Sequence, residues 1–280
     1  MKKIALQGVQ GCFHEIAARA YFRNEDLEII ECKSFKEVFE VMKKDSSIMG
    51  SIAIENTIAG SLLPNHDMLR NSNSWIIGEH KLRVKQNLCV LPDDELSDIR
   101  EVHSHPIALM QCGDFLDSHP DWKLVEKEDT ASSAREIART NGHNQAAICS
   151  TLAAEIYGLK VLVPGIETNK RNFTRFLMLA DKLLADDMNK DKEINKASLV
   201  FAVSHQPGAL SKVLSIFSFY DINLTKIQSL PIIGREWEYL FYIDVTFDDY
   251  LRYKQSLDAI TPLTKNLKIL GEYATGEQTV

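Results

Sequence analysis

A run of hydrogen-bonding side chains follows the apolar segment 48–54 and is the first place in the sequence where chemistry could occur. The run consists of Glu55, Asn56 and Thr57, and Gly60 follows it. Open α/β sheets bind ligands beyond the ends of strands, where such side chains would point into a crevice. A turn that caps the next helix explains the same residues, because Asn and Thr are common at helix starts.

The second candidate is a cluster at the start of the apolar segment that ends near residue 181. It places an arginine and a hydroxyl among aromatic side chains, in the order Asn172, Phe173, Thr174, Arg175 and Phe176. A guanidinium binds a carboxylate through two parallel hydrogen bonds, so this arginine is a candidate clamp for a carboxylate. A surface ion pair explains the same arginine equally well.

Two expected helix starts form the third candidate. Ser104 and His105 lie at one of them, directly before a proline, and Thr130 and Ser132 lie at the other. The free N–H groups and the dipole at a helix N-terminus favour anions. Ordinary helix capping accounts for the same residues.

The elements that would position these clusters follow from the pattern of apolar residues. From residue 3 to about 181, short apolar segments alternate with amphipathic ones, which is typical of βα units around a mostly parallel sheet. Residues 181–197 carry charges of alternating sign without glycine or proline and predict a linker. Residues 198–270 then follow the order βαββαβ, which is the ferredoxin-like plan.

The composition is that of an ordinary globular protein. The 280 residues, of which 45% are hydrophobic and 25% charged, correspond to roughly two domains of about 150 residues. The net charge is −7 and the sequence has no basic block. Nucleic acids and anionic membranes bind clustered Lys and Arg, so we expect neither as a partner.

The sequence predicts neither export nor a membrane span. The apolar run that begins at Ile4 ends at Gln7, which is too short for a signal peptide. No run approaches the roughly 18 apolar residues that cross a bilayer. Five scattered cysteines without a C-x-x-C pair suggest reduced thiols. We therefore expect a cytoplasmic protein.

Common cofactor motifs are absent from the sequence. Gly8 and Gly11 do not complete a dinucleotide or phosphate-loop pattern. A zinc-protease motif that would begin at His14 fails, because Ala18 occupies the position of its second histidine. We expect no metal and no organic cofactor.

Taken in order, the three clusters resemble the motifs of the prephenate dehydratase family. The matching stretches are IENTIAG at 54–60, SHPIALMQC at 104–112, DTASSA at 129–134 and NFTRFLML at 172–179. Segments 207–210 and 222–225 resemble the ACT regulatory domain of the same family. Ala53, Thr57 and Ile107 stand where the family usually has proline, serine and glutamine, and Thr57 keeps the hydroxyl.

The resemblance implies an α/β fold with two parts. A two-lobed α/β catalytic domain, similar to periplasmic binding proteins, would precede a ferredoxin-like βαββαβ ACT domain. The expected boundaries are 1–181 for the catalytic domain, with lobes of roughly 1–77 plus 168–181 and 78–167, then 182–197 for the linker and 198–275 for the ACT domain.

The resemblance also implies an activity: conversion of prephenate to phenylpyruvate with loss of water and carbon dioxide, without a cofactor. Thr174 would hydrogen-bond the departing hydroxyl, and Arg175 would hold a substrate carboxylate. Glu55 would supply the proton, because burial in a cleft raises the pKa of a carboxyl group. The other residues expected to order or bind the substrate are Asn56, Thr57, Phe176, Asn172, Ser104, His105, Thr130 and Ser132.

The ACT resemblance implies feedback by L-phenylalanine at an interface between ACT domains, and therefore a homodimer or homotetramer. Gln228 and Leu230 replace a glutamate and an arginine of the family pattern. Because both charges are lost together, we expect phenylalanine still to bind. The expected effector site consists of Gly208, Ala209, Leu210, Leu214, Asn223, Leu224, Gln228 and Ser229.

Two alternatives remain open from the sequence. Arogenate carries an amino group on the same skeleton as prephenate, so arogenate dehydratase is the nearer alternative. A non-catalytic protein that senses an amino acid would also combine a two-lobed cleft with an ACT domain. The intact Thr174-Arg175-Phe176 motif favours an enzyme.

Overall fold

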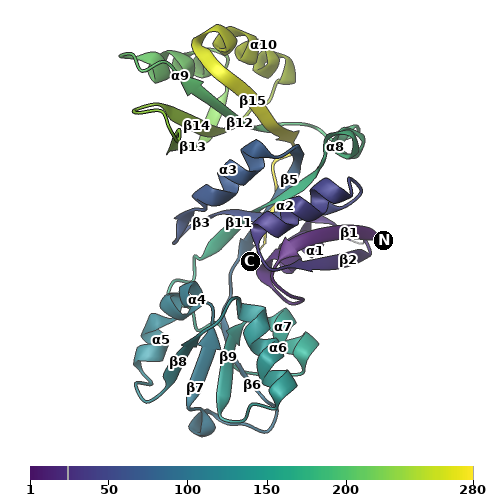
Figure 1. The fold of residues 1–280 in the computed structure, drawn as a ribbon, viewed down its shortest axis with the longest axis vertical. Helices are drawn as coiled ribbons and strands as arrows, with labels where there is room; N and C mark the ends of the chain where they lie inside the picture. The colour runs from purple at the N-terminus through teal and green to yellow at the C-terminus, as the bar shows by residue number, and fades with distance from the viewer. Residues whose placement is uncertain (24, 280) are drawn as a thin grey trace.

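The computed structural model describes residues 1–23 and 25–279 and contains three β-sheets spread along the length of the molecule (Figure 1). The sheet that includes the first strand lies in the middle, and the other sheets lie at the two ends. We call the parts built on them the first lobe (middle), the second lobe (residues 87–163) and the βαββαβ domain (residues 196–273).

The first lobe is a mixed sheet with helices packed on it. Its strands are β1 (Lys2–Gln7), β2 (Leu27–Cys32), β3 (Met49–Asn56), β4 (Gly60–Ser61), β5 (Ser74–Arg83), β11 (Phe173–Asp181) and β16 (Gln278–Thr279). Its helices are α1 (Phe13–Tyr21), α2 (Phe35–Lys44) and α3 (Leu63–Asn71). The strand order is β16-β5-β11-β3-β1-β2, with β4 paired to β3. β1 is parallel to β2 and β3, whereas β11 is antiparallel to β3 and β5.

The second lobe is a five-stranded sheet with the order β10-β6-β9-β7-β8. Its strands are β6 (Asn87–Val90), β7 (Glu101–Ser104), β8 (Lys123–Glu126), β9 (Gln145–Cys149) and β10 (Lys160–Val163). Its helices are α4 (Pro106–Gln111), α5 (Gly113–Asp117), α6 (Thr130–Thr140) and α7 (Thr151–Tyr157), with a 3₁₀ turn at Leu96–Asp98. Two segments connect the lobes, 84–86 and 164–172.

The third sheet has the order β13-β14-β12-β15. Its elements are β12 (Lys196–Val203), α9 (Ala209–Phe219), β13 (Asn223–Pro231), β14 (Tyr239–Thr246), α10 (Tyr250–Ile260), a 3₁₀ turn at Thr261–Leu263, and β15 (Thr264–Tyr273). This βαββαβ order, with the first strand between the third and the fourth, is the predicted ferredoxin-like plan. The α/β fold class expected from the sequence is confirmed.

Strand and helix ends differ from the expected boundaries at three places. β5 continues to Arg83, past the expected lobe boundary at 77. Gly78 lies within this strand, and a Cβ there would come within 2.3 Å of the Tyr21 ring. The glycine therefore allows Tyr21 to pack closely against the strand and does not end it. The segment 182–197 contains helix α8 (Lys182–Asn189) and the start of β12. Beyond the expected end at 275, β16 pairs in parallel with β5.

The described residues contain no helix with the length and apolar content to cross a membrane. Within 1–23 and 25–279, no group of three or more His, Cys, Asp and Glu side chains is placed to hold a metal ion. The cysteines are buried free thiols.

The βαββαβ domain and the first lobe share one apolar core. Val200 and Leu270 of the third sheet pack in the same cluster as Ile76 and Leu179 of the first. At Gly271 of β15, an added Cβ would lie 2.4 Å from the Ile76 Cβ and 2.5 Å from the Ile76 carbonyl oxygen. The backbones of β15 and β5 are therefore closer than a side chain at this position allows.

Replacing Gly271 with alanine should loosen this docking, because backbone cannot yield to a new methyl group without moving one sheet against the other. We expect Gly271→Ala to lower the free energy of unfolding by about 1–3 kcal/mol, the usual cost of overpacking. Thermal and urea unfolding measure it. The matched control is Gly113→Ala, where an added Cβ meets nothing within 4 Å. Equal stabilities of the two variants would contradict the tight contact.

Candidate active site

A cavity of about 330 Å³ lies between the two lobes and collects side chains from both. The first lobe contributes Gln7, Cys12, Phe13, His14, Phe35, Ala53, Asn56, Ala59, Leu62, Thr174 and Phe176. The second lobe and its connections contribute Val84, Gln86, His105, Ile107, Ala108, Gln111, Glu128, Asp129 and Thr130. Another cavity, of about 400 Å³, lies beside α2 and α3 and contains none of the predicted site residues.

Thr174 and Asn56 face each other across β11 and β3 and point into the interlobe cavity. The Asn56 Nδ2 donates to the Thr174 Oγ1 at 2.8 Å. The Asn56 Oδ1 accepts from the backbone N–H groups of Ile58 at 2.9 Å and Ala59 at 2.8 Å, which fixes the orientation of its amide. Because Asn56 is the donor in this pair, the hydroxyl proton of Thr174 is free to be donated to a bound molecule.

Asn172 and Gln111 extend this hydrogen-bond chain to the second lobe. The Asn172 Oδ1 accepts from Asn56 at 2.8 Å, and the Asn172 Nδ2 donates to the Gln111 Oε1 at 2.9 Å. The Gln111 side-chain NH₂ is therefore left to act as a donor at the cavity wall. Asn172 is fully buried and does not line the cavity, so it orients the residues that do.

A β-bulge decides which residues of β3 face the cavity. Arg175 pairs with Glu55 and Phe176 pairs with Ala53, so Ile54 is an extra residue on β3. Simple alternation would put Ala53 and Asn56 on opposite faces. The bulge brings both to the cavity face, opposite Phe176 and Thr174.

Arg175 and Glu55 point away from the cavity, because successive side chains of a strand alternate between faces. The Arg175 Nε donates to the Glu79 Oε2 at 2.5 Å, and its Nη1 donates to Asp244 of the βαββαβ domain. Glu55 accepts from Lys226 of the same domain. The geometry thus does not support the expected roles of Arg175 as a carboxylate clamp and Glu55 as a proton source.

Thr57, Ser104 and Ser132 also lie outside the cavity lining. The Thr57 Oγ1 accepts from the Phe173 N–H and donates to the Arg171 carbonyl, both at 3.0 Å, and so ties β3 to the segment before β11. The Ser104 hydroxyl donates to the Ile148 carbonyl at 2.7 Å, and the Ser132 hydroxyl donates to the Asp129 carbonyl at 2.9 Å. These hydroxyls support the local backbone.

Two neutral histidines line the cavity. The His105 Nδ1 accepts from the Ile107 N–H at 3.2 Å and caps α4, and burial lowers the pKa of His105. The His14 Nε2 accepts from the Ala53 N–H at 3.3 Å, and burial lowers the pKa of His14 to about 4. Because one nitrogen of each neutral ring accepts, the other carries the proton and can donate.

Asp129 and Thr130 line the cavity at the start of α6. The Asp129 Oδ1 accepts from the N–H groups of Ala131 at 2.7 Å and Ser132 at 3.2 Å and caps the helix. Burial raises the pKa of the Asp129 carboxyl group, and the capping hydrogen bonds only partly oppose the effect.

The described lining of the cavity contains Glu128 and Asp129 but no Lys or Arg. An anion in this cavity must therefore be bound by hydroxyl, amide, imidazole and backbone N–H donors. The helix α1 begins at the cavity with Cys12, Phe13 and His14, and among the described residues the Cys12 side chain makes no capping hydrogen bond, although the Glu15 carboxylate in the first turn accepts from the Gly11 N–H at 2.7 Å. Uncapped N–H groups at a helix start are a binding site for a carboxylate.

The predicted effector residues lie in the βαββαβ domain. Gly208, Ala209 and Leu210 line a cavity of about 540 Å³ that also includes Trp237 and Tyr239. Gly208 has φ +76°, a conformation that favours glycine. The remaining predicted residues lie outside that lining; Leu214 is on α9, and Asn223, Leu224, Gln228 and Ser229 are on the edge strand β13.

Sequence reasoning missed several residues that the structure brings to the interlobe cavity. Gln111 belongs to the stretch 104–112 that carries the family resemblance, so its motif could have identified it. His14 and Gln86 have no local sequence signal and are recognisable only from their place in the fold.

Comparisons with known proteins agree with this architecture. The chain is 32% identical over 275 residues to the bifunctional chorismate mutase/prephenate dehydratase of Escherichia coli K12, covering 97% of this chain and 70% of that protein. It is 35% identical over 285 residues to arogenate dehydratase/prephenate dehydratase 2 of Arabidopsis thaliana, covering 97% and 72%.

Solved structures show the same fold over nearly the whole chain. The prephenate dehydratase of Arthrobacter aurescens in complex with L-Phe has a TM-score of 0.83 and 26% identity, covering 97% of this chain and 90% of that one. A protein described as a novel type of quorum-quenching acylase has a TM-score of 0.85 and 26% identity, covering 98% of both chains. Because the prephenate dehydratase family model itself matches residues 4–183, which span both lobes, the chain belongs to the prephenate dehydratase family.

Proposed function

We propose that the protein converts prephenate to phenylpyruvate in the interlobe cavity and that Thr174 donates a hydrogen bond to the departing hydroxyl. The observation that carries the proposal is the oriented pair of Asn56 and Thr174. The Thr174 hydroxyl oxygen accepts a hydrogen bond from Asn56, so the proton of the Thr174 hydroxyl is directed into the cavity. This is the preorganised donor that a leaving oxygen requires.

The reaction breaks two bonds of the substrate ring. The electron pair of the bond to the departing carboxylate moves into the ring as carbon dioxide leaves, and the hydroxyl on the opposite ring carbon takes its bonding pair and a proton and leaves as water. Formation of the aromatic ring drives the process. The enzyme must hold the dianion, stabilise negative charge on the departing oxygen and provide the proton.

The α1 N-terminus is the proposed site for one substrate carboxylate, with Gln111 and His105 as further donors at the cavity wall. Charge neutralisation by Lys or Arg is not needed if several N–H dipoles point at the anion. Phe176 and Phe13 supply apolar surface for the ring.

Asp129 is the proposed proton donor in place of Glu55. It lines the cavity from the lobe opposite Thr174, and burial raises its pKa, so a larger fraction of its carboxyl group is protonated at a given pH. Threonine is too weak an acid for this step, and its part is to stabilise the charge that develops on oxygen.

Arogenate is the alternative substrate, because relatives named for both substrates match the chain at similar identity. An acylase activity, suggested by one structural relative, would require an activated nucleophile. The Cys12 thiol lines the cavity, but burial raises its pKa to about 12, which keeps it protonated. The site therefore favours a dehydratase.

We further propose that residues 198–275 form an ACT regulatory domain that binds L-phenylalanine at the cavity beside Gly208. The cavity is open beside Trp237, whose side chain is 71% exposed. A second copy of the chain would cover it, so a homodimer or homotetramer is the proposed assembly. The loss of the charged pair at Gln228 and Leu230 leaves the backbone groups of this cavity in place.

Removing the Thr174 hydroxyl should slow turnover without unfolding the protein. We expect Thr174→Ala to lower kcat by roughly 10²- to 10³-fold, the usual cost of losing one preorganised donor. Thr174→Ser keeps the hydroxyl and is the matched control. Phenylpyruvate formation from prephenate, measured beside phenylalanine formation from arogenate, identifies the substrate. A Thr174→Ala enzyme within threefold of wild type would refute the assigned role.

Removing the acidic proton of Asp129 should change the pH profile. The wild-type rate is expected to fall as pH rises through the raised pKa of this carboxyl group, and Asp129→Asn should lower kcat and abolish that decline. Asparagine caps a helix as well as aspartate does, so α6 is retained. Asp249→Asn is the control, because Asp249 caps α10 in the same way, far from the cavity. An unchanged profile in Asp129→Asn would assign the proton to another group.

Titration calorimetry tests the effector site. L-phenylalanine should bind the wild-type protein and should bind Gly208→Val at least tenfold more weakly, because a β-branched residue at φ +76° distorts the cavity wall. Gly158→Val controls for backbone strain, since Gly158 has φ +67° and lies in the second lobe. Absence of binding heat with wild type would show that this site does not take phenylalanine.

A further inference from the structure

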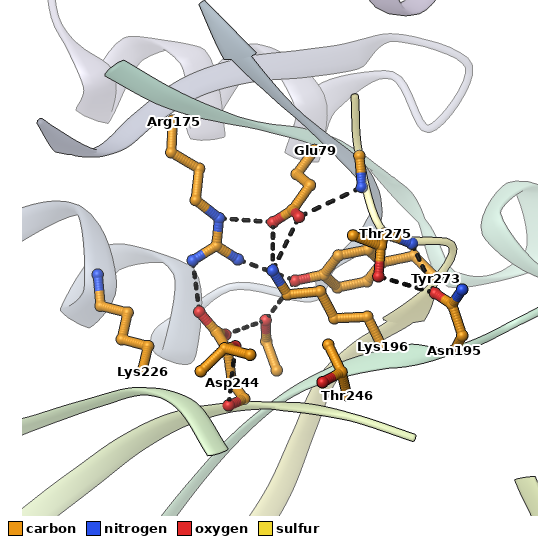
Figure 2. Close-up of polar contacts among 12 residues, drawn as sticks. Glu79, Arg175, Asn195, Lys196, Lys226, Asp244, Thr246, Tyr273 and Thr275 are labelled. Atoms are coloured by element: carbon orange, nitrogen blue, oxygen red, sulfur yellow. Dashed lines mark hydrogen bonds and ion pairs between the residues drawn. The ribbon is translucent and has the colours of Figure 1, made fainter. Parts of the chain in front are cut away.

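A group of buried polar side chains joins the first lobe to the βαββαβ domain (Figure 2). We call this group the interdomain cluster. Its members are Glu79 on β5, Arg175 on β11, Lys196 and Ser198 on β12, Asp244 on β14 and Tyr273 on β15.

The ion pairs of the cluster cross from one part of the protein to the other. Arg175 of the first lobe bonds Asp244 through its Nη1 and the Tyr273 hydroxyl through its Nη2 at 3.1 Å. Lys196 of the βαββαβ domain bonds both carboxylate oxygens of Glu79, at 2.8 and 2.9 Å. Each side thus contributes one cation and one anion, and Figure 2 shows the side chains meeting between the two sheets.

The charges of the cluster persist despite their burial. Burial alone would raise the pKa of Asp244, but Arg175, Lys196 and Ser198 together outweigh this effect and hold that pKa at about 2. Arg175 and Lys196 likewise lower the pKa of Glu79 against the effect of burial. Ions buried in this way are stable only while their partners keep good geometry.

The cluster adjoins the proposed catalytic pair. Arg175 follows Thr174 directly on β11, and Glu55 precedes Asn56 directly on β3. Glu55 is bound by Lys226 of the βαββαβ domain. Each side chain of the Asn56–Thr174 pair therefore has a strand neighbour tied to that domain.

The same cluster is connected to the proposed effector cavity. β12 carries Lys196 at one end and Val203, which lines the cavity, at the other. β14 carries Tyr239 in the cavity lining and Asp244 in the cluster. A shift of β12 against β14 at the cavity would therefore move the Arg175 and Glu79 partners relative to each other.

We propose that the interdomain cluster positions Thr174 and transmits the state of the effector cavity to it, and that Arg175 is a positioning residue rather than a substrate ligand. The planar guanidinium is held between Glu79 and Asp244, so displacement of Asp244 pulls on β11 next to Thr174. The inference rests on the proposed function for its substrate and effector.

The decisive variants change the cluster without entering the cavity. Arg175→Lys keeps the positive charge, but a lysine lacks the planar guanidinium that bonds the carboxylates of Glu79 and Asp244 at the same time. Asp244→Asn removes one end of the bridge from the βαββαβ domain. We expect each to lower kcat at least tenfold with KM for prephenate within about threefold. The double variant should be no worse than the more severe single variant, because both break the same connection.

The regulatory coupling is measured as a ratio of two prephenate concentrations. Each is the concentration that gives half-maximal rate, one with saturating phenylalanine and the other without it. Such coupling is typically about 5- to 150-fold, and we expect it to fall below about twofold in both variants while calorimetry still detects phenylalanine binding. If the wild type does not bind phenylalanine, both the proposed effector and the proposed transmission to Thr174 are refuted. The kcat of Asp244→Asn still decides whether the cluster positions Thr174.

Arg252→Lys and Asp221→Asn are matched controls, because Arg252 and Asp221 form an exposed ion pair in the same domain. Both should retain wild-type kcat and coupling.

If Asp244→Asn does not fold, the paired change Glu55→Gln with Lys226→Gln tests the neighbouring contact between β3 and the βαββαβ domain. Removing both partners of that ion pair leaves neither charge without its partner. The paired change should reduce coupling. Arg175→Lys with a raised KM, wild-type kcat and intact coupling would make Arg175 a substrate ligand and overturn the proposal.

Discussion

The pairing of β11 with β3 is the constraint on which the candidate site depends. It sets Thr174 against Asn56 on one face of the sheet and Arg175 against Glu55 on the other. The first face borders the cavity between the lobes, and the second borders the βαββαβ domain. The hydrogen-bond donors of the cavity and the charged side chains that contact the βαββαβ domain are thus adjacent residues of the same two strands. A movement of one set therefore displaces the other.

This division leaves the described cavity lining without cations and places the charged side chains in the interdomain cluster. In the cavity, each amide of the chain from Gln111 to Thr174 has a fixed orientation, because each acceptor oxygen already has a donor. A donor that is oriented before the substrate arrives needs no reorganisation during the reaction. The arrangement would suit the proposed substrate, an anion whose charge moves during the reaction, because donors spread around the cavity would not neutralise it at one point.

The two parts of the protein are held together by apolar packing as well as by ions. The shared core and the close approach at Gly271 supply the non-directional attraction, and the interdomain cluster fixes the relative position. The pKa of Asp244 is about 2 in the folded protein against an ordinary value of 3.8. Its contribution to stability is therefore present above that ordinary value and is lost as pH falls toward 2.

The sequence by itself determined the order of elements, the βαββαβ plan and the motifs that bring Thr174, Asn56 and His105 to the same cavity, because hydrophobic periodicity and local motifs are properties of short segments. Only the tertiary structure decided which face each motif residue takes. An extra residue at Ile54 is not visible in the sequence, yet it turns Ala53 and Asn56 to one side. Arg175 and Glu55 looked catalytic beside Thr174 and Asn56, but strand alternation directs them to partners such as Asp244, 69 residues from Arg175 along the chain. Long-range pairing of this kind has no local sequence signal, because its energy comes from side chains that become neighbours only after the domains pack.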